Sequence, residues 1–309
     1  MTTFGDQVFE FGGAPVSGGR YTNPFATHWF VDGNSGEGND GFDGKAPNRA
    51  KATIDAAAQE MGVGDVCYIR PKTYVVGTGH ARYEECVTVD LAQSDLTFIG
   101  TGYPRNNEFG VRMKCDGTTL YCFDISGPSC HIENIGLFAS SATNTLLARN
   151  NGATNTQRGS DGIVLYNVNS KGAPLKITGG QAARVINCVF NNAAYELILA
   201  DPAVSGYNQQ VRGCAFLDTA QETAPTHPQI SSAGSNVICL WVDSCYLGRI
   251  PTTSAYYFIC AVNSSGMFTN CYFDSANVCL TDDVSIGGSS FRFVGCYDAT
   301  KELVDATAD

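Results

Sequence analysis

A repeated cysteine pattern constrains this chain of 309 residues more than any other feature. Five segments of its second half have a large apolar residue, then Asn, Gly or Ser two positions later, and then Cys. The repeated cysteines are Cys188, Cys214, Cys245, Cys271 and Cys296, spaced by 26, 31, 26 and 25 residues. Two earlier segments fit the same template with Ile135 and Val168 in the cysteine position. A period of this length predicts a repeat architecture.

The spacing within each copy predicts a sharp bend. Strand side chains alternate, so an apolar residue three positions before the cysteine would face the other side of one continuous strand. A bend at the residue before the cysteine aims both side chains inward, and Asn and Gly tolerate the left-handed backbone that it needs. The expected bend residues are Asn187, Gly213, Ser244, Asn270 and Gly295. Two short strands joined in this way predict the coil of a parallel β-helix, with the cysteines stacked in its core as free thiols.

The first coil of a β-helix needs a cover, because an open end exposes unpaired backbone groups and apolar side chains. Residues 51–61 predict a cap helix with Ile54, Ala57, Ala58 and Met61 on one apolar stripe. The segments VCYI, VTVD and LTFIG that follow predict the strands of the first coils. We expect a β-helix domain over residues 29–309, preceded by an anchoring arm over residues 1–28.

Composition and charge exclude several classes of protein. The net charge of −11 argues against nucleic-acid binding, which needs clustered Lys and Arg. The 13 cysteines are odd in number and form no CxxC motif, so neither a disulfide framework nor a zinc site is expected. No apolar run is long enough for a membrane span, and the first residues lack the features of a signal peptide. We therefore expect a protein that folds in the cytoplasm without a membrane partner.

A family resemblance adds to this prediction. The succession of WFVDGNSGEGNDGFDG at residues 29–44, ATIDAAAQ, GDVCYIRPKTY and LTFIGTG resembles the start of right-handed β-helix proteins of the pectin-lyase-like superfamily. Lys72 stands where the strand-closing P-G-T-Y of that family has glycine. The resemblance implies an all-β, right-handed, single-stranded parallel β-helix of about eight to ten coils. It covers about residues 29–102 by motif and the rest by repeat, and it implies no one function, because this fold carries lyases, hydrolases and inert virion parts.

The leader FGDQVFEFGGAPVSGG, residues 4–19, is similar to short leaders of β-helix proteins from tailed bacteriophages. Its apolar cluster, Phe4, Val8, Phe9 and Phe11, is too short to fold alone and is followed by a glycine-rich hinge. Such a segment is normally disordered unless something holds it. We expect these residues to anchor the chain to another virion protein, and packing on the protein's own helix is the alternative.

Asp32, Asn34 and Asp43 lie at positions 1, 3 and 12 of a calcium-loop-like spacing, but Gly36 and Glu37 do not fit positions 5 and 6. A plain turn is the expected structure, and no metal or cofactor is predicted. The four histidines, His28, His80, His131 and His227, form no Ser-His-Asp spacing and no HExxH motif, so structural roles are expected for them.

Glycoside hydrolysis needs two carboxylates roughly 5 to 9.5 Å apart. Asp218, Asp243 and Asp274 are the candidates, but their offsets from the repeated cysteines differ, so no side-by-side pair and no catalytic residue is predicted. Residues 183–309 contain five Lys and Arg against twelve Asp and Glu, a net charge of −7, which argues against a groove for an acidic glycan. The aromatic residues Tyr256, Tyr257 and Phe258 either stack on sugars from a loop or belong to the coil wall.

Two functions remain open. The first is a structural virion surface protein, either a capsid decoration protein or a short spike, assembled in the host cytoplasm and adhesive to host surface glycans. We expect it to be a homotrimer, because charge density is low and the three aromatic residues add apolar surface. The alternative is a tailspike-like polysaccharide depolymerase, a glycan hydrolase or lyase. The short sequence after Asp298 favours the first function, since tailspike enzymes carry further C-terminal parts.

Overall fold

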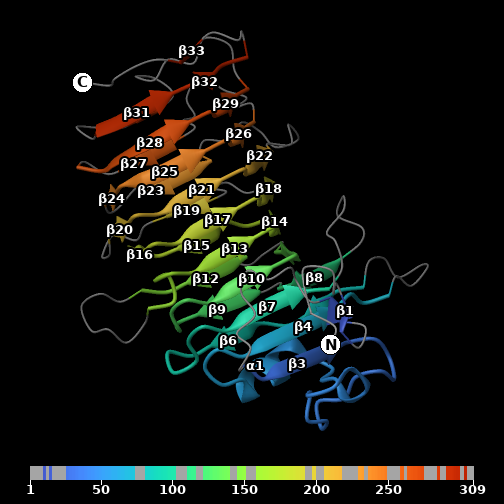
Figure 1. Cartoon of the computed structure of the whole chain (residues 1–309). Coiled ribbons are helices and arrows are strands. Elements are labelled where there is room, and N and C mark those ends of the chain that lie inside the picture. The colour runs from blue at the N-terminus through green and yellow to red at the C-terminus, as the bar shows by residue number, and fades with distance from the viewer. Residues whose placement is uncertain are drawn as a thin grey trace, which may run out of the picture.

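The structure, a computed structural model, stacks short strands rung on rung from β3 near the first end of the chain to β31 and β32 near the other (Figure 1). It describes residues 10–11, 14–15, 26–73, 81–101, 110–115, 121–139, 145–150, 158–191, 197–199, 205–217, 229–232, 236–248, 258–260, 263–274, 284–285, 290–299 and 303–304.

The first sheet contains ten described strands. In spatial order they are β3 (His28–Asp32), β4 (Val66–Arg70), β7 (Thr97–Gly100), β10 (His131–Glu133), β13 (Val164–Tyr166), β17 (Arg184–Ile186), β21 (Gln210–Arg212), β25 (Leu240–Asp243), β28 (Ser265–Thr269) and β31 (Ser290–Val294). Every neighbouring pair in this sheet is parallel.

Three further sheets complete the coils. The second sheet contains β5 (Tyr83–Glu84), β8 (Val111–Lys114), β11 (Ile135–Phe138), β14 (Asn169–Lys171), β18 (Val189–Asn191), β22 (Ala215–Leu217), β26 (Tyr246–Leu247), β29 (Tyr272–Phe273), β32 (Cys296–Tyr297) and β33 (Leu303–Val304). The third contains β6 (Val87–Val89), β9 (Phe123–Ile125), β12 (Leu146–Ala148), β15 (Leu175–Ile177), β19 (Leu197–Ile198), β23 (Ile230–Ser232), β27 (Phe258–Cys260) and β30 (Val284–Ser285). A short fourth sheet contains β16 (Gly180–Gln181), β20 (Gly206–Tyr207) and β24 (Val237–Ile238).

This arrangement is the all-β, right-handed parallel β-helix that the sequence predicted. From β10 onward, each described coil contributes one strand to the first sheet and turns sharply into the second, and every coil as far as β29 continues into a strand of the third. The pairing between β32 and β33 is antiparallel and occurs at the last described rung of the second sheet. The ten rungs of the first sheet agree with the expected eight to ten coils.

The predicted one-residue bends are confirmed. The five expected bend residues have positive φ values: Asn187 53°, Gly213 61°, Ser244 54°, Asn270 52° and Gly295 63°. The backbone N–H groups of the first four continue the ladder between coils, as when the N–H of Gly213 donates to the carbonyl of Asp243 at 2.9 Å. The bend therefore resets the side-chain alternation without interrupting the hydrogen bonds between rungs.

The cysteine column is confirmed as a stack of free thiols in the core. All five repeated cysteines are buried, and the apolar residues three positions before them are buried as well. Each thiol from Cys214 onward contacts the thiol of the coil before it. Burial raises the pKa of Cys214, and the contact with Cys245 raises that of Cys271 to about 12. Thiols with raised pKa values stay protonated at neutral pH and act as small apolar side chains.

The cap helix is shorter than predicted. Helix α1 covers Ile54–Glu60, and Thr53 caps it by accepting a hydrogen bond from the N–H of Ala56 at 3.2 Å. Lys51 lies outside the helix because its backbone pairs with Val31 beside β3. The predicted apolar stripe is buried over the first coil as expected. No helix in the described part of the chain has the length and hydropathy of a membrane span.

A buried carboxylate fastens this end of the molecule. Asp65 accepts hydrogen bonds from the N–H of Thr27 at 3.0 Å, the indole of Trp29 at 2.9 Å and the N–H of Gly62 at 2.8 Å. These donors come from the segment before β3, from β3 itself and from the end of the cap region. The Gly-Asp pair between helix and strand in the sequence therefore ties the cap to the first rung.

Little of the predicted anchoring arm is described. Two short strands, β1 (Glu10–Phe11) and β2 (Ala14–Pro15), pair antiparallel, and a single 3-10 turn, η1 (Pro47–Arg49), precedes the cap helix. Phe4, Val8 and Phe9 lie outside the described residues, and of Phe11 only the backbone is described. The division into an arm and a β-helix domain, and the anchoring role, stay predictions.

Replacing Cys245 by Asp tests the thiol column. Cys245 is 2% exposed, and its sulfur lies 3.3 Å from the carbonyl oxygen of Asp243 and 3.6 Å from that of Val211. A carboxylate there would be buried among oxygen acceptors, so we expect unfolding free energy to fall by ~3 kcal/mol or more in denaturant titrations. Cys245→Val is the matched control, because Val168 fills the same position in an earlier coil, and it should cost far less. Equal stability of the two variants would contradict the buried column.

Candidate functional site

The outer face of the first sheet carries a network of polar and aromatic side chains on β21, β25, β28 and β31. Alternate residues of each strand point outward. Backbone register places Gln210, Trp241, Met267 and Arg292 in one outward column. A second column contains Arg212, Asp243, Thr269 and Val294. Side chains that are far apart in sequence thus become neighbours one strand spacing apart, ~4.8 Å.

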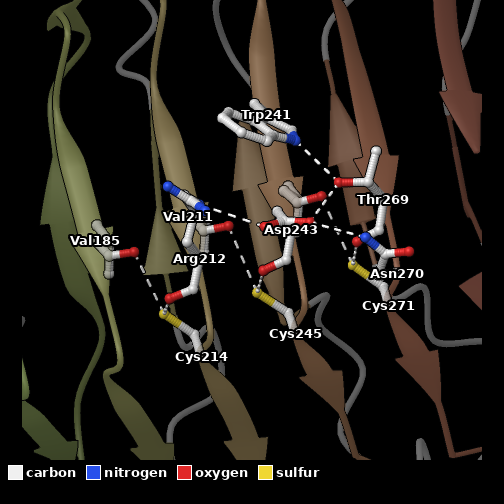
Figure 2. A network of polar contacts seen from close by, with 11 residues as sticks. Val185, Val211, Arg212, Cys214, Trp241, Asp243, Cys245, Thr269, Asn270 and Cys271 are labelled. Atoms are coloured by element: carbon white, nitrogen blue, oxygen red, sulfur yellow. Dashed lines mark hydrogen bonds and ion pairs between the residues drawn. The ribbon is translucent and has the colours of Figure 1, made fainter. Parts of the chain in front are cut away.

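Trp241 is a half-buried aromatic platform whose ring is held on two sides. Its indole N–H donates to the Thr269 hydroxyl at 2.9 Å, across one strand spacing. The guanidinium of Arg212 lies 4.8 Å from the centre of its ring, a cation–π contact. Figure 2 shows Arg212, Trp241 and Thr269 converging on this part of the sheet from three neighbouring strands. The indole is therefore fixed before any ligand arrives.

Asp243 completes the network. The Thr269 hydroxyl donates to its carboxylate at 2.7 Å, and the Asn270 amide does so at 3.3 Å. The Arg212 Nε donates to the other carboxylate oxygen at 3.4 Å (Figure 2). The hydrogen bond from Thr269 is the main cause that lowers the pKa of Asp243. The carboxylate is therefore ionised at neutral pH and suits hydrogen-bond acceptance rather than proton donation.

A groove of about 610 Å³ adjoins this network. It is lined by Cys239, Leu240, Trp241, Ser265, Gly266, Met267, Ser290, Phe291 and Arg292. Ser265, a small outward residue, lies beside Met267 in this groove, whereas Gly266 faces the core, where a Cβ would clash with the carbonyl of Leu240 and the ring of Phe291. Met267 is 37% exposed, so a ligand in the groove would meet an indole, a thioether and the Arg292 guanidinium together.

The predicted carboxylate candidates do not meet. Asp243 lies in the network above, whereas Asp274 accepts a hydrogen bond from the Tyr246 hydroxyl at 2.6 Å, and Asp218 lies outside the described residues. From β7 to β31 of the first sheet, the other described outward carboxylate is Glu133. Four strand spacings separate β10 from β25, so Glu133 and Asp243 are ~19 Å apart, well beyond the separation of a glycosidase pair.

The calcium-like segment forms local turns, as expected. Asp32 accepts hydrogen bonds from Asn34 and from the Arg70 guanidinium, the latter at 2.6 Å. Asp43 pairs with Arg49 at 3.1 Å. These side chains thus contact different protein partners, and no group of three or more metal-binding side chains occurs among the described residues.

The described histidines lie away from the network. His28 is exposed and stacks on the ring of Tyr68 at 5.7 Å. His131 is buried, and burial lowers its pKa to about 4, so its imidazole is neutral at pH 7. His80 and His227 lie outside the described residues.

For one of the three aromatic residues the coil-wall alternative is confirmed, and the other two are untested. Phe258 is fully buried in β27, where its ring packs against those of Phe268 and Phe291, so it belongs to the coil wall rather than to a loop. Tyr256 and Tyr257 lie outside the described residues. Phe258 therefore gives no support to an apolar contact surface for trimer formation.

The net charge of −7 over residues 183–309 does not describe the outer face of the first sheet. On the described strands from β17 to β31, the outward charged residues are Arg184, Arg212 and Arg292 against Asp243, a net charge of +2. The net charge of residues 183–309 is a sum over all faces of the coils. Strand alternation places three arginines on the described outer face of the first sheet and only one of the carboxylates. An acidic ligand is therefore compatible with the face.

A sequence signal for this site existed. In every copy of the repeat, the residue four positions before the cysteine points outward, and so does the residue two before it. Reading the sequence at the first offset gives Arg184, Gln210, Trp241, Met267 and Arg292. Sequence reasoning missed these residues because it followed carboxylates and not the outward register.

The lowered pKa of Asp243 predicts a pH-dependent contribution to stability. An unfolded Asp titrates near 3.9. A folded pKa below that value means that the ionised form contributes stability fully above pH ~4, and this contribution is lost as pH falls through the folded pKa. We expect Asp243→Asn to lower the unfolding free energy by ~1 kcal/mol at pH 7, and by less at about pH 3. Denaturant titrations at both pH values measure this, and a constant difference would contradict it.

Comparisons with known proteins show the fold. No protein-family model matches the sequence, and no curated protein sequence matches it. Among solved structures, a rhamnogalacturonan lyase matches at a TM-score of 0.52 and 13% identity, over 88% of this chain and 74% of the lyase. A pectate lyase matches at 0.52 and 12%, over 91% and 78%. The pectin methylesterase from Aspergillus niger matches at 0.51 and 13%, over 94% of each chain. At such identities the similarity extends to the β-helix fold alone.

Proposed function

We propose that this chain is a glycan-binding structural protein of a bacteriophage virion surface, and that the outer face of the first sheet around Trp241 is its glycan site. The observation that carries the glycan part is the fixed indole of Trp241 beside Arg212, Met267 and Arg292. The virion part is supported by the resemblance of the leader to bacteriophage proteins. The solved structures that match are named for pectic polysaccharides, but their identities are too low to assign a substrate here.

The chemistry of the face suits a sugar chain. Sugar rings present apolar C–H faces that pack on aromatic side chains, and hydroxyl groups that need hydrogen-bond partners. Trp241 and Met267 supply the apolar surface, while the hydroxyl groups of Ser265 and Ser290 lie beside it. The groove runs across three neighbouring strands, so an extended chain can contact several residues at once. Binding along a rigid sheet also costs little ordering of the protein.

The arginines favour a glycan that carries acid groups. Arg212 and Arg292 lie on opposite sides of β28, and Arg184 extends the first outward column by two strands from Trp241. Guanidinium groups bind carboxylate and phosphate with two parallel hydrogen bonds. The proposed ligand is therefore an acidic surface polysaccharide of the host.

Binding without cleavage is the favoured activity. Asp243 is ionised and already engaged by three donors, and its nearest outward carboxylate on the described first sheet is ~19 Å away. These features suit recognition. The depolymerase alternative requires a different pair of groups in or near the groove.

Trp241→Ala tests the glycan site. We expect the Kd for purified host surface polysaccharide, measured by calorimetry, to rise at least tenfold, or ~1.4 kcal/mol, because the apolar platform is lost. Tyr207→Ala is the matched control: it removes a 41% exposed aromatic side chain from the fourth sheet and should leave the Kd unchanged. Equal effects of the two substitutions would refute the site. If new reducing ends or unsaturated sugars appear in the same mixtures, the chain cleaves the polysaccharide, and the depolymerase function replaces the adhesive one.

Deleting residues 1–19 tests the virion anchor. The stability of a β-helix comes from contacts between neighbouring rungs, so the truncated chain should retain its unfolding midpoint. We expect it to be absent from assembled particles, as measured by particle purification and immunodetection. Normal incorporation of the truncated chain would contradict an anchoring role for Phe4, Val8, Phe9 and Phe11.

We also propose that the protein forms a homotrimer. Flat sheet faces and low charge density support packing of three β-helices around a common axis. Sedimentation equilibrium at micromolar concentration distinguishes this assembly from a monomer.

A further inference from the structure

Two exposed arginines flank Trp241 at equal distances along the first outward column of the first sheet. The register of the column, from β17 to β31, is Arg184, Gln210, Trp241, Met267 and Arg292. Each arginine lies two strand spacings from Trp241, ~10 Å, and four spacings, ~19 Å, separate the two arginines. The charge of this column is therefore symmetric about the indole.

Both of these guanidinium groups are available to a ligand. Arg184 and Arg292 are exposed, and the ion pairs of arginine in the described part of the chain belong to Arg49, Arg70, Arg149, Arg158 and Arg212. Arg212 also points outward, but its Nε lies 3.4 Å from a carboxylate oxygen of Asp243 and its guanidinium packs on Trp241. Its charge and that of Asp243 cancel beside the indole. The cations that remain for a ligand on β17 to β31 are thus the two that flank Trp241.

The positions between the indole and each arginine are uncharged. On one side Met267 fills the column, and Ser265 and Ser290 line the groove beside it. On the other side the column contains the amide of Gln210. A carboxylate held at these positions would lose part of its hydration without gaining a cation, which costs free energy. At the indole it would also approach the ionised Asp243, two residues further along the same strand, ~7 Å. These positions therefore suit neutral sugars.

We propose that the glycan site recognises the spacing of acid groups, and that its ligand is a polysaccharide in which several neutral sugars separate them. Arg184 and Arg292 bind two successive acid groups, each with paired hydrogen bonds, while a neutral sugar packs on Trp241. A sugar unit of an extended chain is about as long as one strand spacing, so several units fit between the two arginines. A polyuronate, with an acid group on every sugar, would leave its intermediate carboxylates unpaired. The assignment rests on the proposed function and narrows its ligand from acidic polysaccharides in general.

Oligosaccharides of equal length test the spacing, at constant ionic strength so that screening does not change. A gellan oligosaccharide carries uronates separated by neutral sugars, its carboxyl-reduced form carries none, and a galacturonate oligosaccharide carries one on every sugar. We expect the gellan oligosaccharide to bind at least about tenfold more tightly than the other two, as measured by calorimetry. In the double variant Arg184→Gln/Arg292→Gln, the preference for gellan over its carboxyl-reduced form should disappear. Both side chains are exposed, so the variant should keep its Tm.

The matched control is Arg49→Gln/Arg158→Gln, which removes the same two charges from exposed ion pairs elsewhere and should keep the preference. Loss of the preference in this control would overturn the proposal, because the effect would then be one of net charge. Binding of galacturonate as tight as that of gellan, or no binding of gellan, would also overturn it. These outcomes concern the spacing alone. The proposed function fails separately, if Trp241→Ala leaves the Kd for host surface polysaccharide unchanged.

Discussion

The structure depends on one conformational constraint, a single residue with positive φ between the strand of the first sheet and the strand of the second. At Asn187, Gly213, Ser244, Asn270 and Gly295, φ lies between 52° and 63°, and the N–H of the bend still donates to the next coil where that coil exists. Without this residue, the apolar side chain before the bend and the cysteine after it would face opposite sides of one strand. With it, both enter the core, and each coil can stack on its neighbour in the same register.

The same bend determines the outer face. Asp243 takes part in both the core and the outer face. Its backbone carbonyl accepts a hydrogen bond from the N–H of Gly213 and lies 3.3 Å from the sulfur of Cys245. Its carboxylate points outward and accepts hydrogen bonds from Arg212 and Thr269. One residue thus joins the thiol column to the candidate site. Because the strands are stiffened by ladders on both sides, the side chains of the Trp241 network are held in position by the scaffold rather than by a loop.

Charge is distributed by face rather than by segment. The chain carries −11, yet the outward charged groups on the described first-sheet strands from β17 to β31 sum to +2. The alternation of strand side chains separates these groups from the acidic residues of other faces. Electrostatic steering acts through such local fields, so a net charge says little about which ligand a particular face attracts.

The sequence by itself determined the repeat, the bend residues and the buried thiols, because each depends on contacts with the same position of an adjacent coil. It also determined the apolar stripe of the cap helix, because that stripe follows from helical periodicity. It did not fix the helix start, since Lys51 pairs with Val31, a contact that no local propensity encodes. Nor did it predict the network of Arg212, Trp241 and Thr269. These residues lie 28 to 57 positions apart in the sequence and come into contact only across neighbouring strands. Alignment of the repeats on their cysteines gives the fold and the outward columns. Only the tertiary structure decides which contacts the side chains make between columns, as when Trp241 donates to Thr269 and stacks with Arg212, because those contacts depend on side-chain conformation.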